Sequence, residues 1–146
     1  MKVPPVQEIL NMLAPNIMTK TDIPVEHVRI VWEEVVDLVC MHTGYTPRTI
    51  FARRREQDLC DARQLLWTLA KLHCLHLSLP SIGRLSHPGD GNGRDHTTVL
   101  HGTRKGIHHP KFAMLNQQLT DLYAEKRRLA MDAAGQVEPV DAYAGA

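Results

Sequence analysis

Residues 93–105 read Gly-Arg-Asp-His-Thr-Thr-Val-Leu-His-Gly-Thr-Arg-Lys, and the rest of the chain is organised around them. Asp95 can cap a helix here, because its carboxylate can accept a hydrogen bond from a free amide one turn on. Residues 96–98 are polar and would occupy the first turn. Residues suited to an inward side follow at three- and four-residue steps, namely Val99, Leu100, Thr103 and Ile107. The pattern predicts a short helix with one packed side, and helices that read bases usually present their first turn to the DNA major groove.

This stretch resembles a known family. Residues 93–101, Gly-Arg-Asp-His-Thr-Thr-Val-Leu-His, are similar to the C-terminal DNA-binding domain (domain IV) of the bacterial replication initiator DnaA. Residues 78–84, Ser-Leu-Pro-Ser-Ile-Gly-Arg, resemble the family's Ser-Leu-Pro-Glu-Ile-Gly, and residues 62–64, Ala-Arg-Gln, extend the likeness. The resemblance covers roughly residues 25–110. It implies an all-α, Trp-repressor-like helix-turn-helix bundle of about five to six helices.

Charge is distributed unevenly along the 146 residues. The net charge is only +1, but residues 1–47 carry a net −3, residues 48–111 a net +6 and residues 112–146 a net −2. A basic middle is what a phosphate-contacting face requires, and the charge of the whole chain hides it. A hydrophobic content of 43% with only 5% aromatic residues favours one small aliphatic helical domain over a β-sandwich.

Apolar residues at helical spacing predict the remaining helices. Asp22-Ile23-Pro24 has the residue types of a helix start, so we expect a first helix over 25–42. Thr46 and Pro47 have the residue types of the cap and first position of a second, short helix. The other expected helices are 59–77, a short one capped by Ser78, and 111–133, whose Lys126-Arg127-Arg128 would complement the helix dipole. Within 59–77, the inward stripe would include Leu72 and His76, and a more exposed side would carry Arg63 and Lys71.

Composition sets the expected domain boundaries. We expect an N-terminal arm or short helix over 1–21, the helix-turn-helix DNA-binding domain over 22–133, and a flexible, disordered tail over 134–146, which is small and acidic. The arm has a short apolar patch, residues 9–13, which could cover the domain's own core or dock on a protein partner. Together with the valine-rich first helix, the arm could also pair two copies of the chain.

The turn between the two helix-turn-helix helices departs from the family. Residues 85–93 hold about five residues more than the family's Phe-Gly-Gly type of turn. Pro88 and its small neighbours cannot hold a fixed crossing angle alone, so we expect core packing to set it, with Gly83 permitting close approach. The extra residues could reach phosphates through glycine amides or form a mobile insertion.

The resemblance implies DNA-contacting positions residue by residue. Major-groove base contacts fall on Asp95, His96 and Thr97, with Thr98 close behind; aspartate can accept from cytosine N4, and threonine methyls can meet thymine methyls. Arg55 aligns with an arginine that enters the minor groove, where narrow A/T-rich DNA favours a guanidinium. Phosphate contacts are expected from Arg53, Arg54, Arg63, Lys71, Leu79, Pro80, Arg94, Arg104 and Lys105, with Leu79 and Pro80 acting through main-chain amides. The alternative for the arginine run, for Arg63 and for Lys71 is an ordinary solvated charge.

Other chemistry finds little support. Three cysteines without paired spacing favour reduced thiols in a cytosolic protein. The nine histidines form no metal-ligand spacing, and neither a phosphate-binding glycine loop nor a catalytic triad can be defended. We therefore expect no enzyme activity, no cofactor, no metal, no nucleotide and no membrane association, and a cytoplasmic, nucleoid-associated location. The family's ATPase domain is not in this sequence.

Three functions remain open at this point. The first is a sequence-specific regulator that binds double-stranded DNA at a DnaA-box-like site and acts on transcription. The second is a replication modulator that competes with DnaA at its boxes. The third is an adaptor that binds a protein through the N-terminal arm and keeps only a vestigial DNA face. A preferred sequence in selected DNA would separate the first two from the third.

Overall fold

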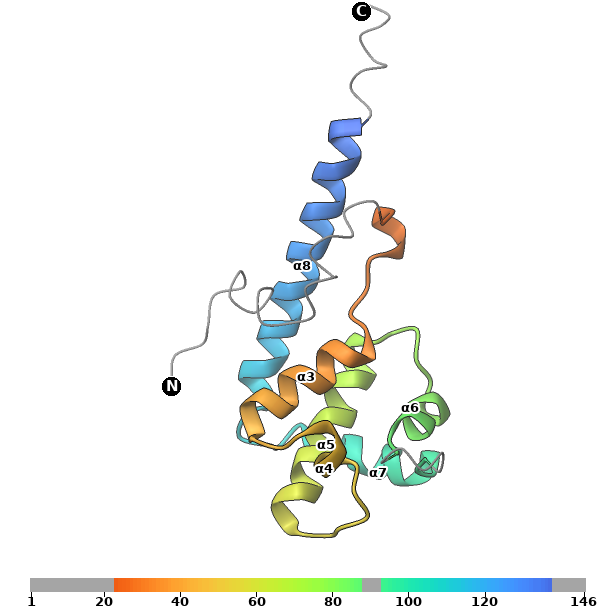
Figure 1. Cartoon of the computed structure of the whole chain (residues 1–146), viewed down its shortest axis with the longest axis vertical. Coiled ribbons are helices and arrows are strands. Elements are labelled where there is room, and N and C mark those ends of the chain that lie inside the picture. Colours follow the sequence, from red (N-terminus) through yellow and green to blue (C-terminus); the bar gives the residue numbers. More distant parts are fainter. Residues whose placement is uncertain (1–22, 88–92, 138–146) are drawn as a thin grey trace, which may run out of the picture.

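The computed structural model describes residues 23–87 and 93–137, and the chain is all-α within those ranges (Figure 1). A short 3₁₀ turn comes first, η1 (Val25–His27). The helices are α3 (Trp32–Thr43), α4 (Pro47–Ile50), α5 (Gln57–His73), α6 (Leu79–Leu85), α7 (His96–Gly106) and α8 (Phe112–Val137). The all-α helix-turn-helix fold is confirmed, with α6 and α7 as the helix-turn-helix pair. The expected arm over 1–21, residues 88–92 of the long turn and residues 138–146 of the expected tail lie outside the described residues.

Helix α5 is the centre of the bundle, and α3, α7 and α8 pack against it (Figure 1). Its inward stripe is fully buried and is met by side chains of every neighbouring helix. The core includes Val35, Leu38, Ile50, Leu59, Leu65, Leu66, Leu69, Ile82, Val99, Leu115, Leu119 and Leu122. Burying one such side chain contributes about 1.5–3 kcal/mol, so this aliphatic core provides most of the stabilisation.

The expectation of one helix over 25–42 is wrong at its start. Residues 25–27 form only the 3₁₀ turn, and α3 begins at Trp32 after a short connecting segment. The cap that decides this is Glu34, whose carboxylate accepts a hydrogen bond from the Val31 amide at 2.8 Å. Trp32 also stacks on Phe51, with 5.9 Å between the ring centroids. Tertiary packing therefore overrides the local start signals at residues 22–24.

The starts of α4, α6 and α7 agree with the sequence, whereas α5 begins two residues earlier than expected, at Gln57, and two helix ends differ. The side chains of Thr46, Ser78 and Asp95 each accept a hydrogen bond from an amide of the first turn of α4, α6 and α7. Helix α5 ends at His73, so His76 lies beyond the helix and is exposed. Leu72, in the last turn of α5, is 47% exposed. Neither side chain points inward, contrary to the expectation. Helix α8 continues to Val137, four residues beyond the expected end.

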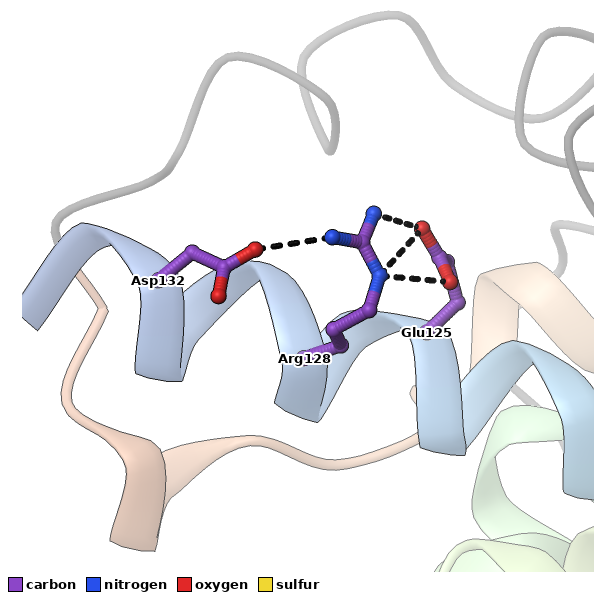
Figure 2. Close-up of polar contacts among 3 residues, drawn as sticks. All are labelled: Glu125, Arg128 and Asp132. Carbon is purple, nitrogen blue, oxygen red and sulfur yellow. Dashed lines mark hydrogen bonds and ion pairs between the residues drawn. The ribbon is translucent and has the colours of Figure 1, made fainter. Parts of the chain in front are cut away.

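The C-terminal part of helix α8 projects away from the bundle (Figure 1). A buried ion pair adds to the core packing of Leu115, Leu119 and Leu122, which holds the rest of the helix. The Lys126 ammonium donates to the Glu34 carboxylate at 2.6 Å and to the Arg29 carbonyl at 2.9 Å. The second charged cluster is exposed: Arg128 pairs with Glu125 on one side and with Asp132 on the other (Figure 2). Glu125 and Asp132 raise the pKa of Arg128, and Arg128 in turn lowers the pKa of the Glu125 carboxyl. Exposed pairs along one helix add little stability, so among the charged residues of these two clusters Lys126 contributes most to holding α8.

Two glycines let α7 lie against α5. A Cβ atom on Gly102 would stand 2.4 Å from the Trp67 ring, and one on Gly106 would stand 2.2 Å from the Gln64 carbonyl oxygen. Atoms cannot approach this closely, so neither position tolerates a side chain while the helices keep their distance. The Thr68 hydroxyl reaches across the same contact and donates to the Thr103 carbonyl at 3.2 Å.

The base of the long turn is closed, although residues 88–92 lie outside the described residues. The Arg94 amide donates to the Gly83 carbonyl at 2.8 Å. A Cβ atom on Gly83 would stand 2.1 Å from the Arg94 carbonyl oxygen, which shows that α6 and the start of α7 touch through backbone. Beneath them, the Trp67 indole donates to the buried Ser86 hydroxyl at 2.9 Å. Backbone contact, this hydrogen bond and the packing of Trp67 thus hold α6 and the start of α7 together at the base of the turn.

Candidate nucleic-acid interface

A groove of about 680 Å³ runs between the loop after α4 and the exposed side of α7. Its rim brings together a basic loop, residues 53–55, and the start of the helix predicted to read bases. The lining residues are Arg53, Arg54, Arg55, Cys60, Arg63, Gln64, Trp67, Gly93, Arg94, Asp95, Thr98, His101, Gly102 and Lys105. Six of these side chains are arginine or lysine and one is acidic, so the groove suits a polyanion.

The four predicted base-contacting residues form the exposed first turn of α7. Asp95, His96, Thr97 and Thr98 are all open to solvent. Asp95 caps the helix by accepting from the Thr97 amide at 3.0 Å. Hydrogen bonds from Thr97 lower the pKa of the Asp95 carboxyl, and the His96 ring lies 3.5 Å from its other oxygen. Asp95 is therefore an ionised acceptor at the tip of the helix.

Arg55 lies in the basic loop, across the groove from α7, and is exposed. Within residues 23–87 and 93–137, no hydrogen bond or ion pair holds its guanidinium. Arg54 forms an ion pair with Glu56, and both Arg53 and Arg54 are exposed on the same rim. The loop thus offers arginines on the side of the groove opposite the predicted base-reading turn.

Arg63 does not occupy the exposed side of α5 on which its predicted phosphate contact depends. It is 5% exposed, and its guanidinium donates to the Ile50 carbonyl at 2.5 Å and to the Ala52 carbonyl. Burial lowers its pKa, because a guanidinium out of water is stabilised only by such partners. The expectation that Arg63 lies on an exposed side of α5 is wrong, and its contact with phosphate stays a prediction.

Arg94 is likewise turned into the protein and not toward solvent. Its guanidinium donates to the Ser86 carbonyl at 2.5 Å and to the carbonyls of Phe51 and Ala52, each at 3.0 Å. Its side chain is half-buried at the floor of the groove. Arg94 thus joins α7 to the basic loop, and its predicted contact with phosphate stays a prediction.

The remaining predicted phosphate contacts are spread around the groove. Lys105 lines it and Arg104 is exposed beside it on the last turn of α7. Lys71 is exposed on α5, one turn beyond the groove-lining Trp67. Leu79 and Pro80 occupy the first turn of α6, where Leu79 is half-buried and Pro80 is exposed. Their contacts with DNA stay predictions.

Sequence reasoning missed several residues that shape the groove. His101 and Gln64 line it, on the sides of α7 and α5 that face it, and Trp67 forms part of its floor against Gly102. A signal was available for Gly102, because a glycine within a helix costs about 1 kcal/mol relative to alanine and so indicates a close contact. No comparable signal marks His101 or Gln64, whose roles depend on which helices pack together.

The described residues offer neither a metal site nor a membrane-spanning helix. No set of three or more His, Cys, Asp or Glu side chains among them is arranged to hold a metal ion. No helix in the same ranges is both long enough and apolar enough to cross a membrane.

Comparison with known proteins gives one family and a set of related proteins. The family described as "Bacterial dnaA protein helix-turn-helix" matches residues 32–105. The chromosomal replication initiator protein DnaA of Brucella abortus is 39% identical over 77 residues, which is 53% of this chain and 14% of that protein. The DnaA protein of Xanthobacter autotrophicus is 33% identical over 93 residues, 64% of this chain and 17% of that protein. The DnaA protein of Leptothrix cholodnii is 42% identical over 71 residues, 48% of this chain and 13% of that protein.

The chain therefore spans less than a fifth of the length of these relatives. No solved structure matched the chain. The family match begins at the first residue of α3 and ends within α7, so it contains the basic loop and the helix-turn-helix pair but not α8.

Proposed function

This chain belongs to the bacterial DnaA helix-turn-helix family, and from that premise we propose that it binds double-stranded DNA at a DnaA-box-like sequence and regulates transcription there. The finer part of the proposal, a preferred box and a role at promoters, goes beyond family membership. The arrangement of charges and polar side chains around one groove supports DNA binding with a preferred box, and the role at promoters is tested by an experiment of its own.

The observation that carries the proposal is the placement of Arg55 and the first turn of α7 on opposite rims of one cationic groove. A helix in the major groove and an arginine in the adjacent minor groove must straddle the sugar-phosphate strand that separates the two. The groove between the loop and α7 provides a seat for that strand. Phosphate contacts there would position the protein, and the two rims would read sequence and shape.

The chemistry of the first turn of α7 suits direct readout. The ionised Asp95 carboxylate can accept from cytosine N4, and the methyl groups of Thr97 and Thr98 can contact a thymine methyl. His96 adds a ring that can donate or accept. Since all four side chains are exposed, they can reach base edges without any rearrangement of the bundle.

Asp95→Asn and His96→Ala are each expected to weaken specific binding by about 1–3 kcal/mol and to leave non-specific binding nearly unchanged. Asparagine is chosen because it caps helices about as well as aspartate, while it removes the charge and replaces one acceptor oxygen by an NH₂ donor. Fluorescence anisotropy with a box duplex and a scrambled duplex measures both affinities.

Lys105→Ala is the matched control for these variants. It removes a groove charge that we assign to phosphate, so it should weaken both duplexes about equally and lower the salt-dependence slope by about 1. Direct readout by Asp95 would be refuted if Asp95→Asn weakened both duplexes alike.

Selection of bound sequences from a random duplex pool tests the proposal as a whole. A single DnaA-box-like consensus supports it, and the absence of any preference overturns it in favour of a protein-binding role. Mapping of occupied genomic sites then tests the transcriptional part, because occupancy at promoters supports it and occupancy confined to origin boxes favours competition with DnaA.

A further inference from the structure

We propose that Arg63 and Arg94 are positioning residues that act as a clamp: together they hold the carbonyls of residues 50–52 and thereby place Arg55 opposite the first turn of α7. The inference rests on the proposed function, because it explains how that DNA-contacting face is assembled. Neither arginine touches DNA in this account; both act through the basic loop.

The clamp is visible in the hydrogen bonds that converge on three consecutive carbonyls. Arg63, from α5, donates to Ile50 and Ala52. Arg94, just before α7, donates to Phe51 and Ala52 at 3.0 Å each. The Ala52 carbonyl is shared by both guanidinium groups, and the arginine run begins at the next residue.

Arg94 also ties the loop to the helix-turn-helix turn. One of its guanidinium nitrogens donates to the Ser86 carbonyl at 2.5 Å, and its amide donates to Gly83 at 2.8 Å. A planar guanidinium can serve acceptors on two segments at once, which a single ammonium cannot do with the same geometry. Arg94 therefore fixes the loop, the end of α6 and the start of α7 relative to one another.

The basic loop needs such a device. Its three arginines repel one another, and α4, which precedes them, is only four residues long. The carbonyls at the end of a helix lack partners within it. The clamp satisfies those groups, and its hydrogen bonds hold the loop in place against the repulsion among the cations. Without it, the loop could still carry its charge, but Arg55 would lose its fixed distance from α7.

Binding to duplexes that differ in the base pairs beside the box tests the clamp. Duplexes carrying the selected box, with either A·T or G·C pairs where the minor groove meets the loop, are compared for wild type, Arg55→Ala, Arg94→Met and the double variant. We expect wild type to prefer the A·T flank by about tenfold, and each single variant to lose that preference while keeping its preference at the major-groove positions.

The double variant separates positioning from direct contact. If Arg94 acts through Arg55, the double variant should bind no more weakly than Arg55→Ala alone, because the effects of two substitutions on binding do not add when both remove the same contact. The clamp is refuted if the two losses multiply, or if Arg94→Met keeps the flank preference. A wild-type protein without any sequence preference would instead refute the proposed function, and the clamp would then be decided by the following measurement.

Trypsin cleavage of the free protein tests the clamp without DNA. Loss of a charged hydrogen bond that holds the loop should speed cleavage after Arg53 or Arg54 by about tenfold in Arg94→Met, with little change in the thermal midpoint of the bundle. Arg127→Met, which removes the same charge from α8, is the matched control and should cleave like wild type. Unchanged cleavage in Arg94→Met would overturn the clamp whatever the DNA result.

Arg94→Lys takes the place of Arg94→Met if the methionine variant does not fold. It keeps the charge but cannot bridge the Ser86 and Phe51 carbonyls with a planar fork, so the same faster cleavage and the same loss of flank preference are expected. Retention of both properties in Arg94→Lys would show that charge alone positions the loop and would refute the clamp.

Discussion

Gly106→Ala is expected to destabilise the domain by about 3 kcal/mol, at the upper end of overpacking effects, and to abolish specific DNA binding with it. A Cβ atom there would stand 2.2 Å from the Gln64 carbonyl oxygen and 2.0 Å from the Thr68 hydroxyl. The nearest obstacle that cannot rotate away is backbone, so α7 must move off α5. Urea unfolding followed by circular dichroism measures the loss.

Gly135→Ala is the matched control for this prediction. Gly135 also lies in a helix, but nothing stands within 4 Å of the place that its Cβ would take. Alanine should therefore leave stability unchanged or raise it by up to about 1 kcal/mol through helix propensity alone. A Gly106→Ala variant as stable as wild type would mean that α5 and α7 do not pack at the distance described.

Lys126→Met is expected to destabilise the domain by about 3–5 kcal/mol, because it leaves the Glu34 carboxylate buried without its cation. The Glu34 side chain is only 1% exposed, and Lys126 lies 2.6 Å away. The second carboxylate oxygen has no hydrogen-bond partner among the described residues, which makes the pair depend heavily on Lys126. Thermal and urea unfolding of the whole chain measure the effect.

The double variant Glu34→Gln, Lys126→Met should recover much of that loss. The neutral amide still offers an oxygen to the Val31 amide, so the cap of α3 survives while the uncompensated charge disappears. Arg128→Met, in the exposed cluster of Figure 2, is the control and should unfold within error of wild type. Equal losses from Lys126→Met and Arg128→Met would contradict a special role for the buried pair.

Much of the helix-turn-helix unit could be predicted because its determinants are local. A capping residue, an early proline or aspartate and a helical apolar spacing all lie within a few residues of one another, which is why the starts of α4, α6 and α7 agree with the sequence. The start of α3 could not be predicted in this way. Its cap is a buried glutamate whose carboxylate also binds a lysine 92 residues away.

The roles of the arginines also depend on contacts between residues far apart in the sequence. Arg55 and Arg94 look alike as cationic residues in a basic stretch, and both were expected to meet DNA. Arg94 turns inward because the fold brings the carbonyls of Phe51 and Ala52, 43 and 42 residues away, within its reach. Arg63 turns inward for the same reason, with acceptors at Ile50 and Ala52.

The sequence by itself determined the all-α class, the family and the exposed first turn of α7, since these depend on side-chain type and on spacing within one helix. Only the tertiary structure decided that the long turn closes at Gly83 and Arg94, that Gly102 and Gly106 bring α7 onto α5, and that two arginines hold the basic loop. The physical reason is the distance along the chain between the residues that define each feature. A cap or an amphipathic stripe is complete within a few residues, whereas a buried guanidinium or a helix-packing glycine is defined by atoms that only the folded chain brings near.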